Sequence, residues 1–421
     1  MSKLDELIQQ YCPDGVEWKT IDSVTKSICS GLNPRKNFTL NSSGANCNYL
    51  TVKEMASGKI IFSDKTDKIT KEAVCIIQNR SRLEVDDILL SGIGTIGRVA
   101  IVDIPVGDWN CSESVILLKS NQSIINPKYL KYILECTEVQ GYFNSHATGS
   151  TLKGIRQKDL RSLEIPVPPL PVQEEIVRIL DNFIELQAEL QAELQKRKQQ
   201  YNYYLDNLLS FKNINRGGRA EVRWMKLKDV ATQWYRGAGI KREEVSEDGM
   251  PCIRYGEIHT TYNIWFDDCI SHADESKQVS RKYAEKGDIL FAITSEDIPF
   301  VGNSVAYLGN ERILVGGDIV VMKHNQDPKY MAYALSTSDA IKQKGKGKVK
   351  SKVVHTNVPS LQEIVIPIPS IAEQQRIVSI LDRFDTLTTD LTQGLPAEIE
   401  KRRQQYEYYR DKLLTFKRKE A

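Results

Sequence analysis

The sequence predicts an α+β protein with a pseudo-twofold internal repeat, in which two mixed α/β domains are separated by a pair of long antiparallel coiled-coil helices. Three observations support this prediction: a repeated block of sequence, two long stretches with apolar residues at helical spacing, and short β-branched runs between turn residues. The predicted boundaries are a first mixed domain over 1–164, a helix over 165–212, a second mixed domain over 213–365 and a second helix over 366–421.

The internal repeat is clearest in the helical stretches. Residues 196–212 read KRKQQYNYYLDNLLSFK and residues 401–417 read KRRQQYEYYRDKLLTFK, with twelve of seventeen positions identical. Just upstream, IPVPPLPVQEEIVRILDNF (165–183) matches IPIPSIAEQQRIVSILDRF (366–384). The opening LDELI (4–8) resembles LDNLL (205–209), as if it were the tail of a preceding helix. This pattern predicts a cyclic arrangement, in which the start of the chain packs near its end.

Each helical stretch carries one apolar seam. Apolar residues recur at steps of three and four between 176 and 208 and between 377 and 413, a spacing typical of a coiled coil. Two such seams in one chain are most simply buried against each other. Gly394 and Pro396 predict a break or kink in the second helix. Residues 185–195 read ELQAELQAELQ, a four-residue repeat that we interpret as setting the length of the first helix.

The mixed domains show the signals of short strands and helices. NPKYLKYIL (126–134) and its counterpart DPKYMAYAL (327–335) predict one short helix in each domain. Runs rich in β-branched residues and bounded by Gly, Asn and Asp predict strands. These strand predictions fall at Val74–Ile77, Val115–Leu118, Ile313–Val315 and Ile319–Met322.

Composition excludes several classes of protein. The chain has 421 residues, 41% of them hydrophobic and 27% charged, which predicts a soluble protein of two or three domains. The start is charged and no apolar run could span a bilayer, so we expect a cytoplasmic protein without membrane contact. Eight cysteines without a CxxC pair indicate reduced thiols. The net charge is only +2, so any nucleic-acid-binding surface must be local.

Catalytic signatures are missing from the sequence. It holds no GxxxxGK[ST] phosphate loop and no Gly-rich cofactor fingerprint, and its five histidines have no metal-ligand spacing. SGIGTIGR (91–98) matches a nucleotide-binding spacing only loosely, and its flanks favour a turn between strands. The sequence therefore predicts no catalytic residue, no metal site and no cofactor in this chain.

A row of lysines is the strongest candidate for binding a polyanion. In IKQKGKGKVKSK (341–352), the lysines alternate with small or apolar residues, so an extended segment would place every ammonium group on one face. Such a row can neutralise successive phosphates, while a solvated flexible loop is the alternative. The row consists of Lys342, Lys344, Lys346, Lys348, Lys350 and Lys352.

Other candidate residues for contact with phosphates or base edges lie in loops that mix Gly, Arg and Lys, for which ordinary surface placement remains the alternative. They are Arg35, Lys36, Arg98, Lys153, Arg156, Arg236, Lys241, Arg242, Arg254 and Tyr255. Three tyrosines repeat in each helical block, at 201, 203 and 204 and at 406, 408 and 409, and we interpret them as helix-packing or partner-docking residues, with four as the chief candidates. They are Tyr201, Tyr204, Tyr406 and Tyr409.

The duplicated helical blocks, together with the CPDGVEW opening (12–18) and the GLPAEIEKRRQQYEYYRDKLL tail (394–414), resemble type I restriction-modification specificity subunits. The resemblance covers essentially the whole chain. It implies a non-catalytic subunit with two target-recognition domains, each reading one half of a bipartite site in double-stranded DNA. It also implies that the helices set the gap between the half-sites and dock two methyltransferase subunits.

The same resemblance implies where the chemistry lies. S-adenosylmethionine would bind to the methyltransferase subunits, which methylate adenine at N6, and ATP and Mg would serve the partner subunits, including separate restriction subunits. Apart from the resemblance, the residues leave one rival open, a non-catalytic coiled-coil scaffold or adaptor that binds two protein partners. Salt-sensitive, sequence-dependent DNA binding would distinguish the two.

Overall fold

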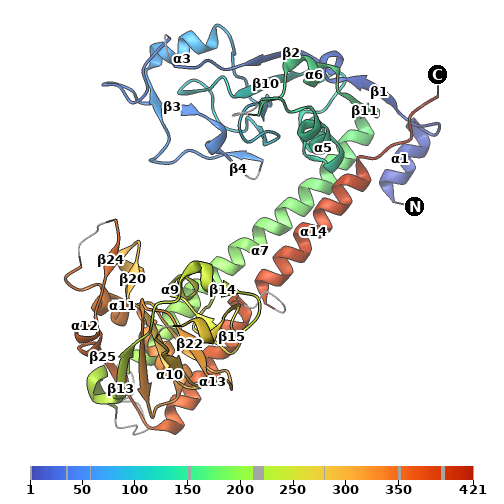
Figure 1. The fold of residues 1–421 in the computed structure, drawn as a ribbon. Coiled ribbons are helices and arrows are strands. Elements are labelled where there is room, and N and C mark those ends of the chain that lie inside the picture. The colour runs from blue at the N-terminus through green and yellow to red at the C-terminus, as the bar shows by residue number, and fades with distance from the viewer. Residues whose placement is uncertain are drawn as a thin grey trace. The chain divides into compact units, whose positions relative to one another are not determined.

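The computed structural model describes residues 2–34, 37–56, 58–149, 153–211, 222–278, 280–348, 352–389 and 394–420. The chain folds into two compact units. Unit 1 consists of residues 1–190 and 399–421, and unit 2 of residues 191–398. Each unit combines short strands and helices with segments of long helix (Figure 1), so the predicted α+β class is confirmed.

A four-stranded antiparallel sheet forms the centre of unit 1, in the order β2-β10-β7-β8. Its strands are β2 (Thr25–Ser30), β10 (Val115–Ser120), β7 (Ile88–Ser91) and β8 (Val99–Ile101). Side chains alternate between its faces, and both faces are buried. Leu90 and Leu118 pack toward α4 (Pro127–Glu135), while Leu89 and Leu117 join the core around Trp109. The predicted strand at 115–118 and the helix at 126–134 are confirmed.

The run Val74–Ile77 is helical, so the strand predicted there is wrong. It lies in α3 (Lys71–Gln78), whose first turn is capped by the Thr70 hydroxyl accepting from the Ala73 amide at 3.3 Å. Ala73, Val74 and Ile77 are buried while Ile76 is 41% exposed. Burial therefore follows the three-and-four spacing of a helix, which a four-residue β-branched run does not reveal.

Unit 1 contains further elements besides the four-stranded sheet, α3 and α4. A second sheet has the order β6-β3-β9, and β4 pairs with β5. The bounds are α1 (Lys3–Tyr11), β1 (Glu17–Thr20), α2 (Ile21–Val24), β3 (Cys47–Leu50), η1 (Val52–Glu54), β4 (Met55–Ala56), β5 (Lys59–Ile60), β6 (Lys68–Ile69), β9 (Trp109–Cys111), α5 (Thr137–His146), α6 (Gln157–Ser162) and β11 (Glu164–Val167).

Unit 2 repeats the frame with a larger sheet. Its order is β13-β23-β19-β21-β16, from β13 (Ala231–Arg236), β23 (Ile319–His324), β19 (Ile289–Ala292), β21 (Ser304–Tyr307) and β16 (Trp265–Phe266). A second five-stranded sheet has the order β14-β17-β15-β22-β18, from β14 (Val245–Ser246), β17 (Ser271–Ala273), β15 (Met250–Ile253), β22 (Ile313–Val315) and β18 (Tyr283–Ala284). The strands predicted at 313–315 and 319–322 are confirmed.

Shorter elements complete unit 2. They are β12 (Arg223–Lys226), α8 (Leu227–Val230), η2 (Arg242–Glu244), α9 (Tyr255–Thr260), η3 (Glu275–Lys277), β20 (Thr294–Ser295), η4 (Ile298–Phe300), α10 (Pro328–Leu335), α11 (Ser338–Gly345), β24 (Val354–His355), α12 (Val358–Gln362) and β25 (Val365–Ile368). The helix predicted at 327–335 corresponds to α10.

Long helices follow both mixed domains. The first, α7 (Leu170–Ser210), has 41 residues and contributes to both units. The second is broken as predicted, into α13 (Ile371–Thr389) and α14 (Leu395–Leu413), with Pro396 in the first turn of α14. In unit 2, Tyr204 of α7 stacks on Phe384 of α13, with ring centroids 5.3 Å apart.

In unit 1, the start of α7 packs antiparallel to α14. Phe183 stacks on Tyr409 with ring centroids 5.6 Å apart, and Arg418 pairs with Glu164 at 2.8 Å. The two chain segments therefore run past each other in opposite directions, as the apolar seams predict.

The start of the chain is held by its end. The Val16 amide donates to the Lys417 carbonyl at 2.9 Å, and the Lys419 amide donates to the Val16 carbonyl at 2.9 Å. Gly15 has a φ of +106°, and a Cβ there would lie 2.6 Å from the Lys417 carbonyl oxygen, so only glycine fits this junction. The predicted packing of the start near the end is confirmed.

The same contacts recur in both units. In unit 2 the Tyr333 hydroxyl donates to Asp382 at 2.7 Å, and in unit 1 the Tyr132 hydroxyl donates to Asp181. These bonds fix each short helix, α4 or α10, on the start of the helix that follows it in sequence.

A second repeated contact ties each mixed domain to the opposite helical block. The Thr137 amide donates to Asp411 at 3.2 Å in unit 1, and the Ser338 amide donates to Asp206 at 2.8 Å in unit 2. Each mixed domain therefore packs on the helical block that follows the other mixed domain in sequence.

Candidate nucleic-acid interface

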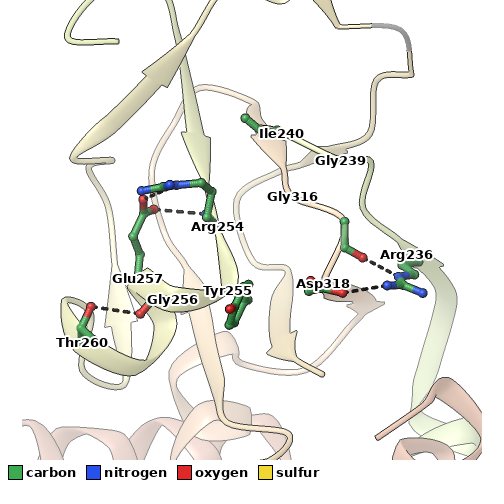
Figure 2. A pocket seen from close by; sticks show the side chains of 11 residues that line it. Arg236, Gly239, Ile240, Arg254, Tyr255, Gly256, Glu257, Thr260, Gly316 and Asp318 are labelled. Carbon is green, nitrogen blue, oxygen red and sulfur yellow. Dashed lines mark hydrogen bonds and ion pairs between the residues drawn. The ribbon is translucent and has the colours of Figure 1, made fainter. Parts of the chain in front are cut away.

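A hollow of about 590 Å³ lies in unit 2, where the end of β13, the start of α9 and the turn between β22 and β23 meet. It brings together three of the predicted contact residues, Arg236, Arg254 and Tyr255. Figure 2 shows Arg254 and Arg236 on opposite sides of the hollow, with Tyr255 between them. Its remaining lining is Gly239, Ile240, Gly256, Glu257, Thr260, Gly316, Gly317 and Asp318.

Glu257 holds Arg254 in place. The Glu257 carboxylate accepts from the Arg254 amide at 3.1 Å and from Arg254 Nε at 3.2 Å. A third bond comes from the Ser271 hydroxyl at 2.7 Å, and Glu257 is only 5% exposed. A buried carboxylate with these partners is a fixed anchor, so the guanidinium is oriented before any ligand arrives.

Arg236 is anchored on the other side of the hollow. Its Nη2 donates to Asp318 at 2.8 Å and its Nε donates to the Gly317 carbonyl oxygen. Neither anchor was predicted from the sequence. The spacing of Arg254 and Glu257, three residues apart, is a signal that could have found the first one. Asp318 is 82 residues from Arg236, and no local pattern connects them.

The lysine row is not the extended segment that the sequence predicts. Lys342 and Lys344 lie in α11, because the Thr337 hydroxyl caps this helix and Ala340 and Lys344 occupy its buried face. Lys344 is 6% exposed, and its Nζ donates to the Ser304 hydroxyl at 3.1 Å. Burial lowers the pKa of Lys344 to about 7. Lys344 therefore belongs to the core of unit 2.

Lys346, Lys348 and Lys352 follow the helix. Lys342, Lys346 and Lys352 are exposed and Lys348 is half-buried, while Lys350 lies outside the described residues. Among the described residues, no ion pair is formed by Lys342, Lys346, Lys348 or Lys352.

A hydrogen-bonded chain connects the far end of the row to the hollow. β24, which starts two residues after Lys352, pairs with β20. His355 on β24 lies 3.2 Å from the Thr294 hydroxyl, and His259 of α9 lies 2.9 Å from the Thr294 carbonyl oxygen. The lysine row and the helix that carries Tyr255 are therefore parts of one region of unit 2.

The candidates in unit 1 are less clustered. The Arg98 guanidinium donates to the carbonyls of Val52 at 3.0 Å and Met55 at 3.3 Å, and so supports the β4 region. Arg156 pairs with Asp159 at 2.8 Å. Lys153 is exposed, and its carbonyl accepts from Gly94 at 2.9 Å, next to the turn between β7 and β8. Arg35 and Lys36 lie outside the described residues.

Two further candidates flank the hollow in unit 2. Lys241 is exposed, and its amide donates to Glu244 at 2.9 Å. The Arg242 backbone begins η2, and the placement of its side chain is not described.

The four candidate tyrosines lie where the helices pack. Tyr204 and Tyr409 form the stacks described above, while Tyr201 packs against the core of unit 2 and Tyr406 against the core of unit 1. Between them, Tyr203 and Tyr408 are 66% and 60% exposed. The repeated tyrosines thus divide into a packed set and an exposed set.

Comparison with known proteins gives consistent matches. The family described as "Type I restriction modification DNA specificity domain" matches residues 13–197 and 220–401. The EcoR124I/EcoR124II type I restriction enzyme specificity subunit of Escherichia coli is 36% identical over 269 residues, which are 62% of this chain and 65% of that protein. A putative specificity subunit of Haemophilus influenzae is 28% identical over 410 residues, 95% of this chain and 96% of that one.

The fold also matches a solved structure. A chain from a study of complex assembly and conformational transition of the type I R-M system superposes with a TM-score of 0.65. The superposition covers 96% of this chain and 98% of that chain at 15% sequence identity. In the part of the chain that the structure describes, no helix is long and apolar enough to cross a membrane.

Proposed function

Because the chain belongs to the type I restriction modification DNA specificity family, we propose that it is the sequence-reading subunit of a type I restriction-modification complex. Each mixed domain reads one half of a bipartite site in double-stranded DNA. The observation that carries this proposal is the duplication itself. Two units share the contacts Tyr132–Asp181 and Tyr333–Asp382 but carry different loops, as two readers of different half-sites would.

In this function the chain recognises the DNA sequence, and its partner subunits carry out the reactions. Two methyltransferase subunits dock on the long helices and bind S-adenosylmethionine, and restriction subunits use ATP and Mg. The exposed Tyr203 and Tyr408 occupy equivalent places in the two repeats, so they offer each methyltransferase the same aromatic contact. We propose that the complex acts in the cytoplasm, where it meets this DNA. Family membership favours this function over a scaffold for two protein partners.

Within unit 2, backbone contact and base reading belong to different elements. Lys342, Lys346 and Lys352 are exposed and Lys348 is half-buried, and their ammonium groups suit phosphates. The hollow carries two arginines that are each paired with a carboxylate, which suits a polar ligand of no net charge.

The proposed function is tested by exchanging one domain. Replacing residues 1–160 with the matching domain of a relative should change one half of the methylated site and leave the other half and the gap unchanged. The reason is that the loops of each mixed domain lie within their own unit. Methylome sequencing of a host that carries the chimera and its methyltransferase subunit measures the result. A change in both halves would contradict separate readers, and the absence of any bipartite methylated site would contradict the function.

The lysines after α11 give a second prediction. Changing Lys346, Lys348 and Lys352 to Ala should weaken binding to all DNA sequences and reduce the slope of log K against log salt by about one unit for each lost phosphate contact. Titration of labelled DNA at several salt concentrations measures both quantities. Lys286→Ala is the control. Lys286 precedes the start of β19, whereas the lysine row connects to β20, which follows the end of β19. An unchanged slope would show that the row does not touch DNA.

A further inference from the structure

Two glycines in the hollow of unit 2 are not required by the fold. At Gly239 and Gly256 an added Cβ would meet nothing within 4 Å, and neither residue has a positive φ. Their neighbour Gly237 is different, because a Cβ there would lie 2.2 Å from the Gly316 carbonyl oxygen. Packing explains Gly237, whereas Gly239 and Gly256 leave space in the hollow that the protein itself does not fill.

Gly256 is also unfavourable for the stability of the helix in which it lies. It is the second residue of the helix α9, and glycine is less favourable than alanine in a helix because it loses more backbone freedom on folding. Gly256 also lines the hollow beside Arg254, where the missing side chain lets a ligand come close to the backbone.

Arg254 is positioned to recognise that ligand. Its backbone amide and Nε are occupied by Glu257, but the described residues offer no hydrogen-bond partner to Nη1 or Nη2. The free edge of the guanidinium can therefore form two parallel hydrogen bonds to a planar acceptor.

The charges in the hollow favour a base over a phosphate. Glu257 and Asp318 balance Arg254 and Arg236, so a phosphate entering the hollow would meet two carboxylates as well as two guanidinium groups. Guanine presents O6 and N7 as a pair of acceptors in the major groove, and its partner cytosine presents an amino donor. Asp318, with its side chain 43% exposed, is a carboxylate that can accept from that amino group.

We propose that this hollow reads a G·C pair in the half-site of unit 2. Arg254 donates two hydrogen bonds to guanine O6 and N7, and Gly239 and Gly256 leave the space through which the edge of the base pair approaches. Tyr255, 40% exposed between the two arginines, contacts the neighbouring base. This inference rests on the proposed function, since it assigns one base pair within the site that the function requires.

The test compares Arg254→Ala, Gly256→Ala and Gly141→Ala in the full chain, assembled with its methyltransferase subunits. Gly141 is the matched control, because it also lies within a helix, α5, and a Cβ there would also meet nothing within 4 Å. Methylome sequencing first defines the wild-type site. Binding is then measured on DNA duplexes that carry each single base-pair change within that site, and thermal unfolding gives the Tm of each chain.

Arg254→Ala should remove the preference for one G·C position by about tenfold to a hundredfold and leave the other half-site unchanged. Gly256→Ala should weaken binding to the wild-type site by a similar factor while its Tm stays the same or rises. Gly141→Ala should likewise leave the Tm the same or raise it, with no loss of binding.

Two results would overturn the inference. If Arg254→Ala weakens all sequences equally and lowers the salt slope, Arg254 contacts phosphate. If Gly256→Ala binds as well as wild type, no ligand approaches that backbone. Either result leaves the proposed function intact, provided that the wild-type complex methylates a bipartite site.

Discussion

A chain that lacks Glu189–Ala192 is expected to methylate a new site, in which both half-sites are retained and the unread gap is shorter by one or two base pairs. Four residues of α-helix span about 6 Å, and successive base pairs are about 3.4 Å apart. The four residues lie within α7, a helix that contributes to both units. Methylation at the original spacing should be lost.

Packing along α7 determines whether this deletion is tolerated. A four-residue step turns a helix about 40° past a full turn, so a strict ELQA repeat drifts around the helix. Leu194 is 7% exposed, Leu190 is half-buried and Leu186 is 48% exposed. The burial of these three leucines therefore increases along α7. Removing one unit rotates the downstream part by about 40°, and Leu186 then takes the place of Leu190.

The control for this experiment keeps the length of the helix. The double change Glu189→Gln with Gln191→Glu alters two exposed residues and preserves both charge and residue count. Methylome sequencing should show the original gap for this control and the shorter gap for the deletion. An unchanged gap in an active deletion complex would mean that α7 does not set the spacing.

Changing Lys344 to Met is expected to stabilise unit 2 at pH 7 by about 2–4 kcal/mol. The lysine is buried with only the Ser304 hydroxyl as its described partner, and its pKa is lowered from 10.5 to about 7. At pH 7 the unfolded lysine binds its proton much more tightly than the folded one, a difference worth about 3–5 kcal/mol. Methionine fills the same space without a charge, although Ser304 loses its hydrogen-bond partner.

The pH dependence of this effect has a definite sign. Between pH 7 and 10.5 the unfolded state binds more protons at Lys344 than the folded state, so the wild-type contribution to stability rises with pH. The gain from Lys344→Met should shrink across this window and vanish near its upper end. Denaturant unfolding at several pH values measures it, with the exposed Lys342→Met as control. A gain that does not change with pH would show that Lys344 is not held neutral by burial.

The sequence predicts the helical framework well and the hollow poorly, and the reason is physical. Residues such as Tyr204 and Tyr409 repeat because the same packing is needed twice, so self-comparison reveals them. Arg254 and Arg236 were predicted from residue type alone. The anchor of Arg236 is Asp318, which only the fold brings near, whereas Glu257 lies three residues from Arg254. The alternation of lysines predicted an extended segment. Thr337 caps a helix there, and periodicity over a few residues does not reveal that cap.

Each mixed domain packs on the helical block that follows the other mixed domain in sequence, and this has a consequence for synthesis on the ribosome. Unit 2 is one uninterrupted stretch, 191–398, whereas unit 1 also needs residues 399–421. At about 5–20 residues per second, the ribosome adds these last residues roughly 10–40 s after it passes residue 190. Until then, the apolar surface that Tyr406, Leu413 and Leu414 cover in unit 1 stays open to solvent. The half of the protein that is made first is thus completed last, and a chain stopped before α14 would emerge with an unfinished N-terminal unit exposed to chaperones and proteases.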